Sequence, residues 1–165
     1  MNMKQPLRYL NWTSEHLISW NPPPEHRVKV DGSFFSINNS VACGGVFKNY
    51  LGRFIVGFSS NLDSCSIMQA NYIWEILKSL QVAIAKNFNC LIIKTDSQMA
   101  MDFMKEGCPS SHPCKSLIED ISILSSRIQH VEWSHILREG KSIVDTLAKK
   151  GHSLFIGPIL LILLS

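Results

Sequence analysis

The hydrophobic pattern of the chain changes its period once, and this change restricts the folds that the chain can form. Residues 27–35 begin with polar and apolar residues in alternation, and two more apolar runs follow at short intervals, at 41–47 and 53–59. Alternation is typical of half-buried strands, so the three runs predict an antiparallel meander with a turn at 49–52. Residues 69–86 instead place apolar side chains three and four positions apart, which predicts a helix with one apolar stripe.

The second half of the chain alternates between strand and helix patterns. A short apolar run at 90–93 predicts a strand that is buried on both faces. The residues after it predict a capped helix, a second helix, a strand and a last helix, at 95–105, 113–128, 130–136 and 140–150. The order βββ-α-β-α-α-β-α predicts an α/β fold with one mixed five-stranded sheet, in which three antiparallel strands precede βα units and helices pack on the sheet.

The chain has 165 residues, which is enough for one domain and too few for two. We expect a leader or linker at 1–26, because the prolines at 22–24 cannot continue a helix or a central strand. The domain itself is expected at 27–151, followed by an apolar tail at 152–165. The apolar run in this tail is far shorter than the roughly 20 residues of a membrane-spanning helix, so we expect a docked or frayed end and no membrane partner.

The composition indicates the setting of the protein. A hydrophobic content of 45% with 18% charged residues excludes a disordered tail or a highly charged nucleic-acid arm. The formal net charge of +3 permits an anionic partner without requiring one. The five cysteines show no C-x-x-C spacing and no secretory signal is visible, so we expect reduced thiols in a nuclear or cytoplasmic protein.

Three aspartates lie in elements that the predicted sheet would bring together. Asp31 lies in the first strand, Asp96 follows the fourth strand, and Asp145 lies in the last helix. Carboxylates that converge in this way suit Mg²⁺ or Mn²⁺, because hard divalent ions prefer oxygen ligands. Two such ions about 3.5–4 Å apart can hydrolyse a phosphodiester. As ordinary alternatives, Asp31 belongs to a turn, Asp96 caps a helix, and Asp145 is a surface residue.

These acids lie in short motifs that resemble the ribonuclease H family, and most closely the reverse-transcriptase-like ribonuclease H domains of plants, which are related to retrotransposon proteins. The matching stretches follow one another in the order and spacing of the family, at 28–33, 43–48, 80–83, 93–97 and 135–149. The resemblance covers about residues 20 to 151 and implies the mixed five-stranded sheet of the ribonuclease H-like fold.

The resemblance also implies an activity and a set of site residues. Members of the family hydrolyse the RNA strand of RNA–DNA hybrids with four acids around two Mg²⁺ ions. Asp31, Asp96 and Asp145 match three of these acids. His135 matches a histidine that is thought to assist proton transfer or product release. In the alternative interpretation, His135 packs against Trp133 or forms a hydrogen bond with a loop.

The chain departs from the family pattern at the second acid. Counting back eight residues from Leu80 reaches Tyr72, where the family has a glutamate. The nearest carboxylate is Glu75, a candidate stand-in that lies about 4.5 Å further along the helix axis. A phenol, with a reference pKa near 10, is a poor Mg²⁺ ligand, so we expect weak activity. Lys29 and Lys141 stand where the family usually has asparagine, and a cation there repels a metal or binds a phosphate.

Three interpretations of the function remain open, and the last two share the absence of catalysis. The first is a Mg²⁺- or Mn²⁺-dependent ribonuclease that acts on RNA–DNA hybrids and is weakened by the missing acid. The second is a catalytically inactive module of the same fold that binds hybrids or structured RNA, and the third is a non-functional transposon-derived product. Binding of nucleic acid needs basic side chains, for which we name Lys48, Arg138 and Lys141. We expect a monomer.

Overall fold

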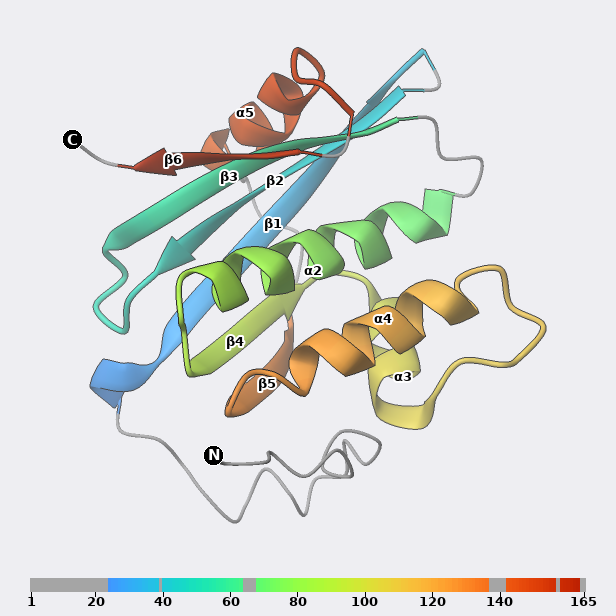
Figure 1. Ribbon diagram of the computed structural model, residues 1–165, viewed down its shortest axis with the longest axis horizontal. Coiled ribbons are helices and arrows are strands. Elements are labelled where there is room, and N and C mark those ends of the chain that lie inside the picture. Colours follow the sequence, from blue (N-terminus) through green and yellow to red (C-terminus); the bar gives the residue numbers. More distant parts are fainter. Residues whose placement is uncertain (1–23, 39, 64–67, 137–141, 157, 164–165) are drawn as a thin grey trace.

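The computed structural model describes residues 24–38, 40–63, 68–136, 142–156 and 158–163 (Figure 1). Most of the expected leader lies outside these residues. The strands are β1 (Val28–Ile37), β2 (Ser40–Lys48), β3 (Phe54–Asp63), β4 (Cys90–Thr95), β5 (His130–His135) and β6 (Ile159–Leu163). The helices are the short 3₁₀ helix η2 (Pro24–His26), α2 (Met68–Ala85), α3 (Gln98–Glu106), α4 (Lys115–Ser125) and α5 (Ser142–Gly151).

The first three strands form the expected antiparallel meander. β1 pairs with β2 and β2 pairs with β3 in antiparallel fashion, whereas β4 joins β1 and β5 joins β4 in parallel fashion. The resulting sheet has the order β5-β4-β1-β2-β3-β6. The helix predicted at 69–86 is α2, shifted by one residue. The mixed α/β architecture predicted from the pattern is therefore confirmed, with β1 at the centre of the sheet.

The sheet has six strands rather than the expected five, because part of the apolar tail pairs with β3. β6 runs antiparallel to β3, from Ile159 opposite Ser60 to Leu163 opposite Val56. Side chains that alternate along a strand point to opposite faces, and here both faces are apolar. Ile159 packs against the main core and Ile162 packs against a smaller cluster on the other face. The tail thus docks on the edge of the sheet that β3 would otherwise form.

The helices cover the two faces of the sheet unequally (Figure 1). On one face lie α2 and α4, which enclose the main hydrophobic core with residues such as Val30 of β1 and Ile121 of α4. On the other face lies α5, which packs over β1, β2 and β3. It contributes Val144 and Leu147 to a small cluster with Val46 of β2. The position of α5 is therefore set by the meander.

A glycine lets α5 approach the sheet closely. A Cβ atom on Gly44 of β2 would lie 2.6 Å from the backbone nitrogen of Ala148. Just beyond the end of α5, Nε2 of His152 lies 2.9 Å from the carbonyl oxygen of Phe35 in β1. Close backbone approach and this hydrogen bond together fix the helix on the strands.

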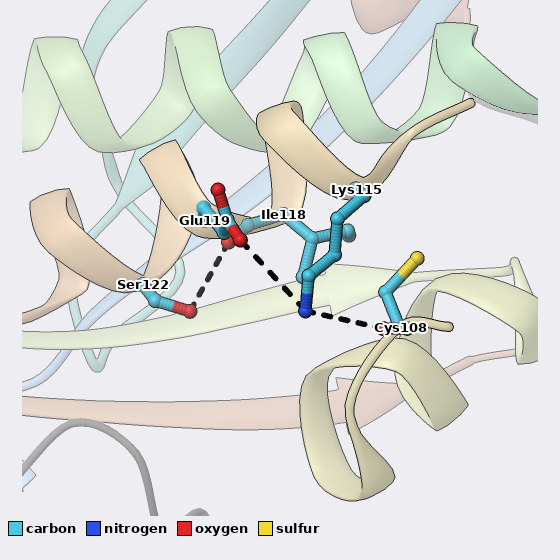
Figure 2. A network of polar contacts seen from close by, with 5 residues as sticks. All are labelled: Cys108, Lys115, Ile118, Glu119 and Ser122. Carbon is cyan, nitrogen blue, oxygen red and sulfur yellow. Dashed lines mark hydrogen bonds and ion pairs between the residues drawn. The ribbon is translucent and has the colours of Figure 1, made fainter. Parts of the chain in front are cut away.

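The connection between α3 and α4 is held by Lys115 at the start of α4 (Figure 2). Its Nζ donates to the carbonyl oxygen of Cys108 at 3.2 Å and forms an ion pair with Glu119 at 3.8 Å. One turn further on, Oγ of Ser122 donates to the carbonyl oxygen of Ile118 at 3.1 Å. The loop therefore lies against the helix that follows it, while α3 stays next to β4 and β5.

None of the four cysteines that the structure describes, Cys43, Cys90, Cys108 and Cys114, forms a disulfide. The fifth, Cys65, lies outside the described residues. Within the described part of the chain, no helix is both long and apolar enough to span a membrane.

Replacement of Gly44 by alanine should destabilise the fold by roughly 3 kcal/mol, because the added methyl group would overlap backbone atoms of α5 that cannot rotate away. Chemical denaturation measures this loss. Gly57→Ala is the matched control, since its Cβ would lie 3.0 Å from the end of the Leu147 side chain and at an ordinary contact distance of 3.5 Å from its other near neighbours. Equal losses in the two variants would contradict the close approach of α5.

Candidate active site

Asp31 lies in the middle of the central strand. It is directly opposite Val46 of β2 on one side and Lys94 of β4 on the other. Residues directly opposite in a sheet share a face, and Val46 belongs to the cluster beneath α5. The side chain of Asp31 therefore points to the α5 face, where its Oδ1 atom is buried from solvent. Asp31 lies within β1 and not in a turn, so the turn interpretation does not apply.

Asp145 approaches β1 from above, in the first turn of α5. Its Oδ1 accepts a hydrogen bond of 2.6 Å from Oγ of Ser33. Ser33 is two residues after Asp31 and so shares its face of the sheet. This bond places the half-buried Asp145 carboxylate beside Ser33, the next residue after Asp31 whose side chain points to the same face. Asp145 is therefore more than a surface residue, and the structure brings it to the same part of the sheet as Asp31.

Asp96 follows β4 immediately. Since Lys94 lies opposite Asp31, continuing the parallel register by two residues brings Asp96 level with Ser33. Ser97, and not Asp96, caps α3, because its side chain accepts from the backbone nitrogen of Ala100 at 3.2 Å. The helix-cap interpretation of Asp96 is therefore wrong, and its half-buried carboxylate lies at the end of the strand next to β1.

His135 ends β5 beside the end of β4. It lies opposite Thr95 in the parallel register, and the backbone nitrogen of Ile136 donates to the carbonyl oxygen of Thr95 at 2.9 Å. Nε2 of the exposed His135 ring lies 3.3 Å from the carbonyl oxygen of Asp96. Of the two alternatives to a chemical role, the structure shows the hydrogen bond to a loop. The imidazole still lies next to the aspartate that follows β4.

Tyr72 and Glu75 approach β1 from the α2 face. The Tyr72 ring packs edge-on against Phe34, with ring centroids 4.8 Å apart. The Glu75 carboxylate lies against Gly32, the residue after Asp31, so closely that a Cβ on Gly32 would overlap it. Only 6% of Glu75 is exposed. The aromatic residue at the expected acid position thus serves packing, while the carboxylate sits one turn further on, under the neighbour of Asp31.

Two more polar groups share the buried space around Glu75. Burial raises the pKa of Cys43 far above its usual range, and the charge of Glu75 raises it further, while Lys78 opposes the shift. Burial lowers the pKa of Lys78, and Cys43 partly offsets this effect. The Nζ atom of Lys78 lies 5.9 Å from the centre of the Trp74 ring. Sequence patterns did not reveal this buried polar group, because a charged residue on a helix is normally taken to face solvent.

The chemistry of the three aspartates fits a hard divalent ion, but their side chains are not gathered around a single point in the structure. Asp31, Asp96 and Asp145 supply the carboxylate oxygens that Mg²⁺ prefers. Among the residues that the structure describes, however, no three His, Cys, Asp or Glu side chains lie close enough together to form a metal site. The bond from Ser33 holds one oxygen of Asp145.

The three predicted nucleic-acid contacts differ in what the structure shows. Lys48 is exposed at the end of β2, opposite Lys29 of β1. Arg138 and Lys141 lie outside the described residues. Sequence reasoning missed Ser33, although it lies in one of the matching motifs, since its role depends on where α5 lies.

The sequence matches the family model described as reverse transcriptase-like over residues 29–151, which is most of the chain. The chain belongs to this family. It is also 30% identical over 145 residues to a protein of Arabidopsis thaliana that is named as a ribonuclease H. That match covers 87% of this chain and 23% of the relative, so the chain spans about a quarter of the relative's length.

Solved structures show the same fold. The N-terminal RNase H domain of Rv2228c from Mycobacterium tuberculosis superposes with a TM-score of 0.67 at 14% identity, covering 77% of this chain and 94% of that domain. RNase H1 from Halobacterium salinarum gives 0.65 at 18% identity, covering 77% and 96%. LC11-RNase H1, solved in complex with an RNA/DNA hybrid, gives 0.61 at 16% identity, covering 75% and 94%. The reverse transcriptase-like domain is therefore RNase H-like in fold, as its motifs predicted.

The contact between Gly32 and Glu75 can be measured with a double-mutant cycle. Gly32→Ala should destabilise the domain by about 1–3 kcal/mol, because the new methyl group overlaps the Glu75 carboxylate. In a Glu75→Ala background, the loss of unfolding free energy caused by Gly32→Ala should be smaller by about 0.5–3 kcal/mol, the usual coupling energy of residues in contact. Urea denaturation of the four proteins gives the coupling. Additive losses would contradict the position assigned to Glu75.

Proposed function

We propose that this reverse transcriptase-like domain binds RNA–DNA hybrids and hydrolyses their RNA strand by two-metal catalysis, with weak activity. Family membership and the RNase H-like fold support the class of function. The observation that carries the proposal is the hydrogen bond from Ser33 to Asp145, which brings a carboxylate of the last helix to the strand that bears Asp31. A structural neighbour, LC11-RNase H1, was solved with an RNA/DNA hybrid.

Each residue has a role in this proposal. Asp31, Asp96 and Asp145 would hold Mg²⁺ or Mn²⁺, since ribonuclease H-like proteins generally use divalent ions. Bound divalent ions activate water and stabilise the leaving oxygen. Ser33 orients the carboxylate of Asp145 by its hydrogen bond. His135, exposed beside Asp96, is placed to exchange a proton at this edge of the sheet.

Weak activity follows from the α2 side of the site. The side chain of Tyr72 packs on Phe34 and offers no carboxylate. Glu75 is the stand-in, and its carboxylate lies against Gly32, adjacent to Asp31. Because catalytic groups must be held to about half an ångström, a carboxylate supplied from the next turn is expected to hold the second ion less well.

A second candidate is a module that binds hybrids or structured RNA without cutting them. The tyrosine at the acid position favours it, as does the spacing of the carboxylates among the described residues. Phosphate contacts depend on basic side chains and backbone amides and not on the metal-binding acids. Binding can therefore persist where catalysis fails.

The first test is cleavage of a labelled RNA–DNA hybrid in Mg²⁺ and, separately, in Mn²⁺. The wild-type protein should cut the RNA strand and Asp31→Asn should not, because an amide cannot supply the negative charge that a divalent ion needs. Asp120→Asn, an exposed acid on α4, is the matched control and should cut like wild type. Equal cleavage by Asp31→Asn would contradict the proposal, and binding without cleavage by wild type would favour the module.

The second test restores the acid on α2. Tyr72→Glu should raise metal-dependent cleavage by roughly tenfold or more, equivalent to about 1.4 kcal/mol of transition-state stabilisation. Tyr72→Phe keeps the ring against Phe34 and should leave cleavage unchanged. Circular dichroism confirms that each variant is folded. A folded Tyr72→Glu protein with unaltered activity would show that the weakness lies elsewhere in the site.

A further inference from the structure

A pair of like charges lies next to Asp31 on the α5 face of the sheet. Lys29 of β1 is directly opposite Lys48 of β2. Lys29 is two residues before Asp31, so it shares the same face about 7 Å further along the strand. Side chains directly opposite in an antiparallel pair have Cβ atoms about 5 Å apart, and like charges in that position destabilise the sheet. A cost of this kind is offset when an anion binds between the two ammonium groups.

The turn that follows Lys48 extends this basic region, and hydrogen bonds fix its backbone. Oδ1 of Asn49 accepts hydrogen bonds of 2.9 Å from the backbone nitrogens of both Leu51 and Arg53. Two backbone bonds close the same turn, from Asn49 to the carbonyl of Arg53 and from Gly52 to the carbonyl of Asn49, each 2.9 Å. Gly52 has a φ of 78°, which suits the left-handed position of the turn. These hydrogen bonds therefore fix the backbone that carries the exposed side chains of the turn.

Two features of the turn suit a nucleic-acid strand. Tyr50 is 44% exposed at its tip, and Lys48 and Arg53 are exposed on either side of it. The segment 48–53 contains these two cations and no acid. An aromatic ring between basic side chains is the arrangement on which bases stack while phosphates are neutralised.

We propose that these four residues, the lysine–tyrosine surface (Lys29, Lys48, Tyr50 and Arg53), bind a nucleic-acid strand that extends away from Asp31. Lys29 and Lys48 contact phosphates, Arg53 contacts a further phosphate, and Tyr50 stacks on a base. The class of ligand rests on the proposed function. With a rise of about 3.4 Å per nucleotide in a duplex strand, the first phosphate contact lies about two nucleotides from the position held at Asp31.

Binding without metal separates this surface from the catalytic site. The binding of a labelled RNA–DNA hybrid to wild type and to the Lys29→Gln/Lys48→Gln variant is measured by fluorescence anisotropy. The buffer contains EDTA, and the KCl concentration is varied from about 50 to about 200 mM. Loss of two phosphate contacts should lower the slope of log K against log[KCl] by about 1.8 and weaken binding on the order of tenfold or more. The exposed lysines of Lys105→Gln/Lys150→Gln provide a control with the same change in charge.

Thermal unfolding distinguishes a binding role from a structural one. Because Lys29 and Lys48 repel each other, Lys48→Gln should raise the unfolding temperature while it weakens binding. A fall in both quantities would mean that the lysines support the fold, and binding equal to that of the Lys105→Gln/Lys150→Gln control would overturn the proposal.

Tyr50 is tested with a hybrid that carries a single-stranded overhang. Tyr50→Ala should weaken binding several-fold and Tyr50→Phe should not, because a phenyl ring still stacks. Equal binding by both variants would remove Tyr50 from the surface. If wild type binds through these residues but cuts nothing, the catalytic proposal fails and this inference stands. If wild type cuts and the lysine variant binds like its control, the catalytic proposal stands and the lysine–tyrosine surface is overturned.

Discussion

The close contact between α5 and the central strands is the constraint on which the candidate site depends. Gly44 leaves room for the helix backbone, and His152 fixes its end to β1. Only in this position can Asp145 reach Ser33 and share a face of the sheet with Asp31. Two carboxylates on one partly buried face repel each other, and a cation between them would relieve the repulsion. The packing of α5 on the sheet thus determines how close the two carboxylates lie and how strongly they would attract a cation.

Much of the fold could be predicted from the sequence, because it depends on local periodicity. The switch from alternation to a helical spacing places β1, β2 and α2 within one or two residues of their observed bounds, whereas β3 continues four residues past its predicted end at residue 59. β6 could not be predicted, since a run of six apolar residues after a Gly-Pro pair is equally compatible with a frayed end. Its pairing depends on β3 presenting an open edge, which is a property of the assembled sheet and not of the segment.

The candidate site could be predicted only in outline. Topology and the resemblance predicted that Asp31, Asp96 and Asp145 lie in elements that the sheet brings together. The register of β1 with β4 agrees with this for Asp31 and Asp96, and the hydrogen bond from Ser33 agrees with it for Asp145. The same reasoning could not place Glu75, because the rotation of α2 against β1 is set by packing across the sheet. Its burial is unexpected for a carboxylate and depends on the missing side chain at Gly32.

The added strand also changes how the domain meets its surroundings. β6 protects the edge of β3 but becomes the outer edge itself, with Leu160, Leu161 and Leu163 each more than a third exposed. Natural edge strands usually carry a lysine or a proline within them that discourages pairing with other molecules, whereas residues 159–163 have neither. This short strand therefore presents an apolar edge with open backbone groups, at which a further strand from another molecule can pair.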